Sequence, residues 1–259
     1  MKSADAIIEV ENLTVGYAHD GEEEVLLKDI SFEVLRGEVF AILGGSGAGK
    51  STLLKHMIGL QKPMAGRITI EGDDIVTADG VERREIMRKF GVMYQMGALF
   101  GSMSTLENVR LPLEEFTEFD DEAIDLIART KLYLVGLSAA AHRAPAELSG
   151  GMQKRAAIAR AMALDPAIVF LDEPSAGLDP ITSADLDRLI VRLARTLGIT
   201  FVVVTHELPS IFAIADRVIM LDHRTRGIIA TGTPEELRDH NSDPWVHRFF
   251  NREPEEVTS

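Results

Sequence analysis

The stretch EVFAILGGSGAGKSTLL, residues 38–54, decides the fold. Within it, GGSGAGKS (Gly44 to Ser51) matches the pattern G-x-x-x-x-G-K-[ST]. The apolar run before this pattern predicts a strand, and the residues after it, STLLKHMIGL, predict a helix. Strand, glycine-rich loop and helix are the context that a phosphate-binding loop requires. We therefore expect the phosphates of ATP to bind here.

Each part of this loop has an expected role. Its glycines allow successive backbone N–H groups to converge on the phosphates, and the helix that follows adds the positive end of its dipole. Lys50 is expected to reach the β- and γ-phosphates and act in catalysis, and the Ser51 hydroxyl is expected to bind Mg²⁺. The expected nucleotide contacts are Gly44, Gly45, Ser46, Gly47, Ala48, Gly49, Lys50, Ser51 and Thr52.

Outward from the loop, short apolar strands alternate with helices. The N-terminal part reads as strands around the loop, and the part after residue 164 alternates strand and helix up to a last strand, GIIATG. Residues 97–163 instead show apolar residues at spacings of three and four, which predicts an all-helical insert. Near-continuous apolar strands separated by helices indicate an α/β fold with a parallel sheet covered on both faces.

Three other strand ends carry residues suited to ATP hydrolysis. IVFLDE ends in Asp172, which can hold Mg²⁺ through water, and in Glu173, which can act as general base for the attacking water. VVVTH, residues 202–206, ends in His206, which is expected to hydrogen-bond the γ-phosphate, with a surface histidine as the alternative. Gln95 follows GVMY and can reach both Mg²⁺ and the water, with an exposed loop glutamine as the alternative. Ligands of parallel α/β folds bind at this edge of the sheet.

LSGGMQKRAAIARAMA, residues 148–163, forms a second expected anion site. Ser-Gly-Gly before a long helix supplies backbone donors and a helix N-terminus without a lysine. One phosphate chain needs only one such site in its own domain. In a head-to-tail homodimer, this segment can close over the ATP of the partner chain, which gives two shared sites related by two-fold symmetry.

Bulk properties exclude several classes of protein. The chain has 259 residues, a formal net charge of −14 and no cysteine. Without a cluster of basic residues, binding to nucleic acid has little support. No apolar run reaches the length of about 18 residues that spans a bilayer, and the start MKSADAIIEVE lacks the pattern of a signal peptide. We expect a cytoplasmic protein.

The ordered set GGSGAGKS, Gln95, LSGGM, VFLDE, SAGLD and VTHE resembles the ATPase domain of ABC transporters over residues 6–232. The resemblance implies a P-loop NTPase (RecA-like) core with an antiparallel β subdomain over residues 6–96 and 164–240, a helical subdomain over residues 97–163, and a C-terminal extension at 241–259. It also implies that Tyr17 stacks on adenine and that Asp179 passes information between the two ATP sites. The signature residues Ser149, Gly150 and Gly151 are implied to face the γ-phosphate bound by the partner chain.

One position departs from the family pattern. Met152 stands where the signature usually has glutamine, and Gln153 follows it. A contact of that glutamine with the nucleotide is therefore not expected here. Tyr17 keeps an alternative as ordinary packing at a strand end.

A narrower resemblance suggests the transporter. GALF with its neighbouring methionines, LLKHMIGL and DPWVHRFFN are similar to the ATPase subunits of MCE-associated (Mla or toluene-tolerance type) systems, which move phospholipids between bacterial membranes. This implies an integral-membrane permease that docks near Gln95 to Met103, an MCE-domain lipid-binding protein and a small accessory protein, with the chain peripheral on the cytoplasmic face of the inner membrane. Met93, Met96 and Met103 are candidates for the docking surface or for core packing.

The C-terminal apolar residues, Leu237, Trp245, Val246, Phe249 and Phe250, either cover the chain's own domain or contact a partner. Three other functions are open. They are an importer ATPase for amino acids or metal chelates, a soluble ABC protein that acts on DNA or ribosomes, and a scaffold that binds ATP without hydrolysis. The single domain and the negative charge argue against the second, and Glu173 with His206 argues against the third.

Overall fold

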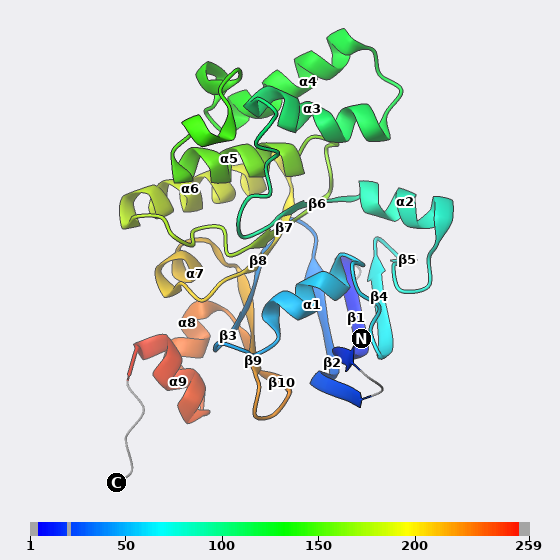
Figure 1. Cartoon of the computed structure of the whole chain (residues 1–259). Coiled ribbons are helices and arrows are strands. Elements are labelled where there is room, and N and C mark those ends of the chain that lie inside the picture. Colours follow the sequence, from blue (N-terminus) through cyan, green and yellow to red (C-terminus); the bar gives the residue numbers. More distant parts are fainter. Residues whose placement is uncertain (1–4, 20–21, 254–259) are drawn as a thin grey trace. The chain divides into compact units, whose positions relative to one another are not determined.

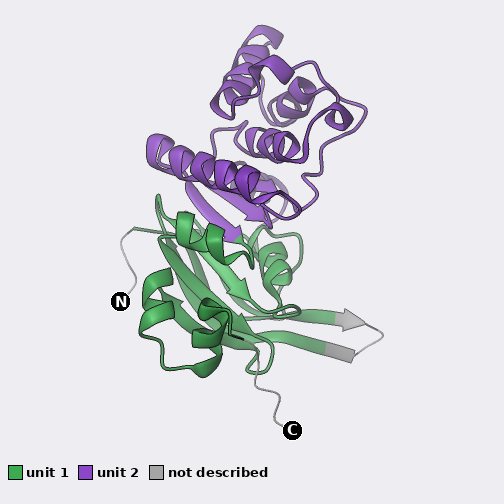
Figure 2. Cartoon of the chain, turned by 90° about the vertical axis from the view of Figure 1, so that its left-hand side faces the viewer, with its two compact units in different colours: residues 1–77, 204–259 green, residues 78–203 purple. Residues whose placement is uncertain are grey.

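The computed structural model describes residues 5–19 and 22–253 (Figure 1). These residues form two compact units (Figure 2). Unit 1 is built from residues 1–77 and 204–259, and unit 2 from residues 78–203. Residues 254–259 of the expected C-terminal extension lie outside the described part.

Unit 1 contains an antiparallel sheet with the strand order β2-β1-β4-β5. Its strands are β1 (Ala6–His19), β2 (Glu22–Leu35), β4 (Ala65–Ile70) and β5 (Asp73–Asp74). Apolar and polar side chains along β1 point to different faces of this sheet: Val10, Leu13 and Val15 are buried, whereas the polar residues between them are not. This sheet is the antiparallel β subdomain that the family resemblance implies.

Unit 1 also holds the strand that leads into the phosphate loop. Strand β3 (Val39–Gly44) is buried along its whole length and pairs in parallel with β9 (Arg217–Asp222), which pairs antiparallel with β10 (Gly227–Gly232). The helices of this unit are α1 (Lys50–Met57), α7 (Leu208–Ile214), α8 (Pro234–Asp239) and α9 (Pro244–Asn251).

The C-terminal apolar residues pack on their own unit. Leu237, Val246 and Phe250 belong to a buried cluster that includes Leu43 of β3 and Met220 of β9. Trp245 and Phe249 are partly buried against the same cluster. Of the two interpretations of the tail, coverage of the chain's own domain is therefore confirmed for these residues. Helices α8 and α9 are the orange and red elements beside β9 and β10 in Figure 1.

Unit 2 combines strands with most of the helices. Strands β6 (Phe90–Met93), β7 (Ile168–Asp172) and β8 (Thr200–Val204) are neighbours in the order β8-β7-β6, and β6 and β7 run parallel. Its helices are α2 (Gly80–Arg88), α3 (Thr105–Phe116), α4 (Asp121–Leu134), α5 (Gly150–Ala161) and α6 (Pro180–Leu197), with short 3-10 turns at Ser138–Ala140 and Pro145–Glu147. Residues 97–163 contain no strand, as the helical periodicity predicts.

Polar caps define the helix ends in unit 2. Ser104 and Glu107 form a reciprocal capping box at the start of α3. At α6, Asp179 is the N-cap, Pro180 is the first residue, and Gly198 ends the helix in the left-handed conformation. These caps fix where the chain enters the helices. The segment from Gln95 to Met103 leads into α3, and the loop SAGLD leads into α6.

The three candidate methionines separate by burial. Met93 is fully buried in β6, so the docking interpretation is wrong for this residue: strand β6 turns its side chain into the core. Met96 is 88% exposed, and Phe100 close by is also exposed. Met103 is half-buried. None of the helices in the described ranges combines the length and the hydrophobicity needed to cross a bilayer.

Candidate nucleotide site

The phosphate loop leaves β3 where a side chain has no room. A Cβ atom built on Gly44 would lie 2.6 Å from the carbonyl oxygen of Leu221 on the neighbouring β9, and the φ angle of Gly44 is +151°. The loop ends at Gly49, the N-cap of α1, which has no side chain with which to cap the helix. The start of α1 therefore depends on other acceptors for its N–H groups, and an anion is a suitable acceptor at this place.

Lys50 is folded over the loop that it follows. Its Nζ atom donates to the carbonyl oxygens of Gly44 and Gly45, at 2.7 and 3.0 Å. These bonds hold the ammonium group against the loop backbone, where it can contact the phosphates of a nucleotide bound to the loop.

Tyr17 lies next to the same helix. Its hydroxyl is 2.7 Å from Oγ1 of Thr52, which is buried in the first turn of α1. The tyrosine itself is 41% exposed. Within unit 1, the structure thus brings together the predicted adenine contact and the phosphate loop, and it leaves part of the aromatic ring accessible for stacking.

His206 is also in unit 1, two residues after the end of β8. The side chain is exposed, and the turn is closed by the backbone N–H of Glu207, which donates to Oγ1 of Thr205 at 3.2 Å. The turn leads directly into α7.

Asp172 and Glu173 lie at the end of β7 in unit 2. Asp172 is the last residue of the strand and is half-buried. Glu173 is buried, with 8% of its surface exposed, and its φ angle is +48°. A residue with a side chain in this left-handed region costs about 1–3 kcal/mol, and such residues cluster at functional sites. The backbone is therefore strained at the residue predicted to be the general base.

The signature segment is fixed by three local contacts. Ser149 is the N-cap of α5, and its Oγ accepts a hydrogen bond from the N–H of Met152 at 3.3 Å. A Cβ atom on Gly151 would lie 2.4 Å from Cγ2 of Thr182 on α6, so only glycine fits there. Gln153 donates to the carbonyl oxygens of Pro145 and Leu148. Gln153 thus supports the loop before the signature, while Met152 stands in the position of the usual glutamine.

Asp179 is engaged at the start of α6. Its carboxylate accepts from the backbone N–H groups of Ile181 and Thr182, and from the hydroxyl of Thr182 at 2.5 Å. The Thr182 hydroxyl and N–H lower the pKa of Asp179. Because the methyl group of Thr182 also abuts Gly151, Thr182 connects Asp179 to the signature helix.

The predicted residues therefore fall into two sets. Unit 1 holds Tyr17, the phosphate loop and His206. Unit 2 holds the remaining predicted residues, which are Gln95, Ser149, Gly150, Gly151, Asp172, Glu173 and Asp179. Gln95 is exposed in the segment after β6. That these two sets act on one ATP stays a prediction.

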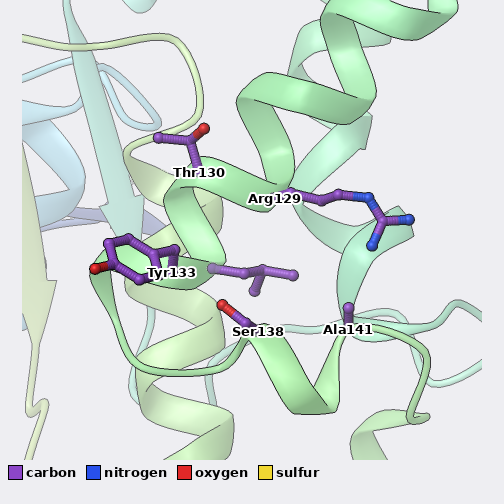
Figure 3. A pocket seen from close by; sticks show the side chains of 6 residues that line it. Arg129, Thr130, Tyr133, Ser138 and Ala141 are labelled. Carbon is purple, nitrogen blue, oxygen red and sulfur yellow. The ribbon is translucent and has the colours of Figure 1, made fainter.

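A cavity of about 360 Å³ lies elsewhere in unit 2, beside α4. Figure 3 shows the ring of Tyr133 and the side chain of Arg129 on opposite sides of it, with Ser138 and Ala141 below. None of the predicted site residues lines this cavity.

Comparison with known proteins defines the class. The family model for ABC transporters matches residues 27–176. This segment contains the phosphate loop, Gln95, the signature and Glu173. The chain therefore belongs to the ABC transporter family of ATP-binding proteins, and it is an ATPase subunit.

Particular relatives cover most of the chain. The "Intermembrane phospholipid transport system ATP-binding protein MlaF" of Haemophilus influenzae is 40% identical over 231 residues, which is 89% of this chain and 85% of the relative. The protein of the same name from Escherichia coli K12 is 39% identical over 87% of this chain and 83% of its own length. The "Probable ribonucleotide transport ATP-binding protein mkl" of Mycobacterium leprae is 39% identical over 94% of this chain and 68% of its own length.

Solved structures of the same class share the fold. An ATP-binding cassette solved as a dimer in a post-hydrolysis state, bound to ADP and Pi, has a TM-score of 0.79 and 32% identity over 87% of this chain and 98% of its own. The cbiO1 cassette of Clostridium perfringens, part of the transporter complex cbiONQ, has a TM-score of 0.81 and 30% identity over 90% of each chain.

One contact of the phosphate loop was missed by the sequence analysis. A Cβ atom on Gly45 would lie 3.8 Å from Cζ2 of Trp245 on α9. The guanidinium of Arg224 lies over the Trp245 ring, 5.2 Å from its centroid, and it is held in turn by Asp222 at the end of β9. These hydrogen bonds from Arg224 also lower the pKa of Asp222. In the sequence, Trp245 is one of several apolar residues near the C-terminus, and no pattern links it to the loop.

Trp245 is the single tryptophan of the chain, so its fluorescence reports on this place alone. We expect ATP binding to change the emission of Trp245, because the loop that it contacts receives the phosphates. A titration of the full chain with ATP measures the change, and the variant K50A, in which loop binding is weakened, should need more ATP. Constant emission at ATP concentrations that saturate binding in a separate assay would contradict the prediction.

Gly150 and Gly151 offer a matched pair. G151A should destabilise unit 2 by about 1–3 kcal/mol, because the added methyl group overlaps Thr182. G150A should change stability by no more than about 0.5 kcal/mol, since its Cβ meets only the movable end of Leu178 at 3.3 Å. Denaturant unfolding of both variants gives the comparison, and equal losses would show that the contact with Thr182 does not matter.

Proposed function

We propose that this ATPase subunit powers an ABC transporter that moves phospholipids between two membranes. The observation that carries the proposal is the alignment with the two relatives named for intermembrane phospholipid transport, over 87–89% of this chain and 83–85% of theirs. The similarity of GALF, LLKHMIGL and DPWVHRFFN to MCE-associated ATPases points in the same direction.

In this proposal, the loop of unit 1 binds the phosphates. The backbone N–H groups between Gly44 and Thr52 and the start of α1 receive the β- and γ-phosphates, and Lys50 supplies the positive charge. Tyr17, anchored to Thr52, stacks on adenine. The conformation of Gly44 and its close contact with Leu221 support this role, because the loop backbone is built for close approach and not for side chains.

Mg²⁺ is the proposed metal. The residues that would hold it are Ser51, Gln95 and Asp172, whose hydroxyl, amide and carboxylate oxygens are the hard donors that Mg²⁺ prefers. When bound, the ion would neutralise charge on the phosphate oxygens. The proposed set contains a single carboxylate, and within the described ranges no group of three or more His, Asp or Glu side chains could hold a metal ion.

Glu173 is the proposed general base for the attacking water, and His206 the residue that hydrogen-bonds the γ-phosphate. Gln95 orients the water through its neutral amide. The strained backbone of Glu173 supports this assignment, since it fixes the direction in which the carboxylate leaves β7.

We further propose that two chains form a head-to-tail dimer in which the signature of one chain faces the ATP of the other. Ser149 and Gly151 would donate to the γ-phosphate across the interface, and Asp179, tied to Gly151 through Thr182, would link the two sites. The dimeric state of the similar cassette bound to ADP and Pi supports this arrangement.

The permease is proposed to dock on the segment from Gln95 to Met103. Exposed Met96 and Phe100 supply apolar surface there, and methionine adapts to irregular partners. The chain would then lie on the cytoplasmic face of the inner membrane, in a complex with an MCE-domain protein and a small accessory protein.

A second cargo class has support in the mycobacterial relatives, which are similar at 39% identity and carry a name for ribonucleotide transport.

A detergent pull-down of the tagged chain from its native membranes, with mass spectrometry of proteins and lipids, tests the phospholipid proposal. Recovery of a permease with an MCE-domain protein and phospholipid supports it. Recovery of a permease with a soluble solute-binding protein overturns the phospholipid assignment and leaves the ATPase intact.

We expect E173Q to lower the ATPase kcat by at least about 100-fold, because the amide cannot accept the proton of the attacking water. ATP binding should persist, so that the variant forms a longer-lived dimer on size exclusion with ATP. E122Q, at an exposed glutamate of the same unit, should keep the wild-type rate and is the control. An unchanged rate in E173Q would remove Glu173 as the base.

A further inference from the structure

Lys154 is a buried lysine in the signature helix. It is 8% exposed and lies five residues after Ser149 on α5. Its ammonium group donates to the backbone carbonyl oxygen of Gln95 and, at 3.4 Å, to that of Glu173. One side chain of the signature helix therefore contacts the backbone of the two residues that the proposed function places around the attacking water.

The face of α5 that carries Lys154 follows the segment after β6. A Cβ atom on Gly97 would lie 3.6 Å from that of Ala157, and Arg160 donates to the carbonyl oxygens of Gly97 and Ala98 at 3.0 and 2.7 Å. Lys154, Ala157 and Arg160 are spaced by three residues, which places them along one side of the helix. Two cations and a small residue between them thus hold the segment against α5.

The charge of Lys154 has a physical reason. The carbonyl oxygens of Gln95 and Glu173 come from different loops, and the carbonyl of Glu173 already accepts the N–H of Ala176 in its own turn. A flexible chain with three donors can reach both, whereas most neutral side chains cannot. Burial of an ammonium group is costly unless it is hydrogen-bonded, so the native arrangement keeps these bonds.

We propose that Lys154 is a positioning residue for ATP hydrolysis, which holds the backbone of Gln95 and Glu173 in fixed register with the signature helix. This inference rests on the proposed roles of those two residues. In this role Lys154 acts through the two carbonyl oxygens. All of these groups belong to unit 2. Since Gln95 and Glu173 are the residues proposed to act on the attacking water, we expect the loss of Lys154 to lower kcat.

The test is the ATPase activity of K154M in the full-length chain. Methionine has a similar length but donates no hydrogen bond, so both carbonyls lose their contact. We expect kcat to fall by about 10- to 100-fold, as for misplacement of reacting groups by about 1 Å, with the KM for ATP within about twofold of wild type. K154R retains donors and should recover most of the rate.

K131M is the matched control. Lys131 is an equally buried lysine of unit 2, 6% exposed, whose ammonium pairs with Asp165 and touches no predicted site residue. If loss of stability were the only cause, K154M and K131M would each lose activity to the extent that their unfolding midpoints fall. K131M should keep the wild-type kcat in the temperature range where it is folded. Should K154M fail to fold, K154Q, whose uncharged amide ends one bond closer to the backbone and so weakens both contacts, should lower kcat in the same direction.

The outcomes separate the inference from the function on which it rests. Three results together support the positioning role: K154M loses kcat at constant KM, K154R recovers most of the rate, and K131M keeps the wild-type kcat. A wild-type kcat in K154M, or losses in K154M and K131M that follow their stability equally, overturns it. If E173Q also keeps the wild-type rate, then the proposed role of Glu173 fails as well; if E173Q is inactive, only the role of Lys154 fails.

Discussion

The contact between the ends of β3 and β9 constrains the phosphate loop of unit 1. A Cβ atom built on Gly44 would lie only 2.6 Å from the carbonyl oxygen of Leu221, so the chain needs a glycine where it leaves the sheet. The loop can then close on itself and present Lys50 over its own carbonyls. Strand β9, the parallel partner of β3, ends at Asp222. Asp222 binds Arg224, whose guanidinium lies over the ring of Trp245 beside Gly45. The loop is thus supported by an element far away in the sequence.

Much of this could be predicted from the sequence, because the signals are local. Apolar runs bounded by glycine gave the strands around the phosphate loop, and the three- and four-residue spacing gave the helices within residues 97–163. Met93 and Met96 could not be separated in this way. They lie three residues apart, and only the end of β6 decides that one is buried and the other 88% exposed. The neighbours of Trp245 and Lys154 depend on tertiary packing, to which periodicity is blind.

Unit 2 shows how a short motif depends on residues outside it. The second glycine of the signature is required by Thr182 of α6, and Thr182 also binds Asp179. Gln153 supports the loop before the signature, and Lys154 contacts the segments of Gln95 and Glu173. The signature helix is therefore connected to Gln95, to Glu173 and, through Thr182, to Asp179. The carbonyl of Glu173, whose own backbone is strained, accepts one of the two hydrogen bonds from Lys154.

The two units also differ in how their chain segments are arranged, and this bears on synthesis. Unit 2 is one continuous segment, residues 78–203, whereas unit 1 joins residues 1–77 to residues 204–259. The buried cluster behind the phosphate loop contains Leu43 near one end of the chain and Phe250 near the other. Since the ribosome produces the chain from its N-terminus, the members of this cluster from Leu208 to Phe250 are synthesised long after Leu43. Unit 2 can form its internal contacts earlier. The phosphate loop, although it is made early, therefore gains its full support only when α9 has been synthesised.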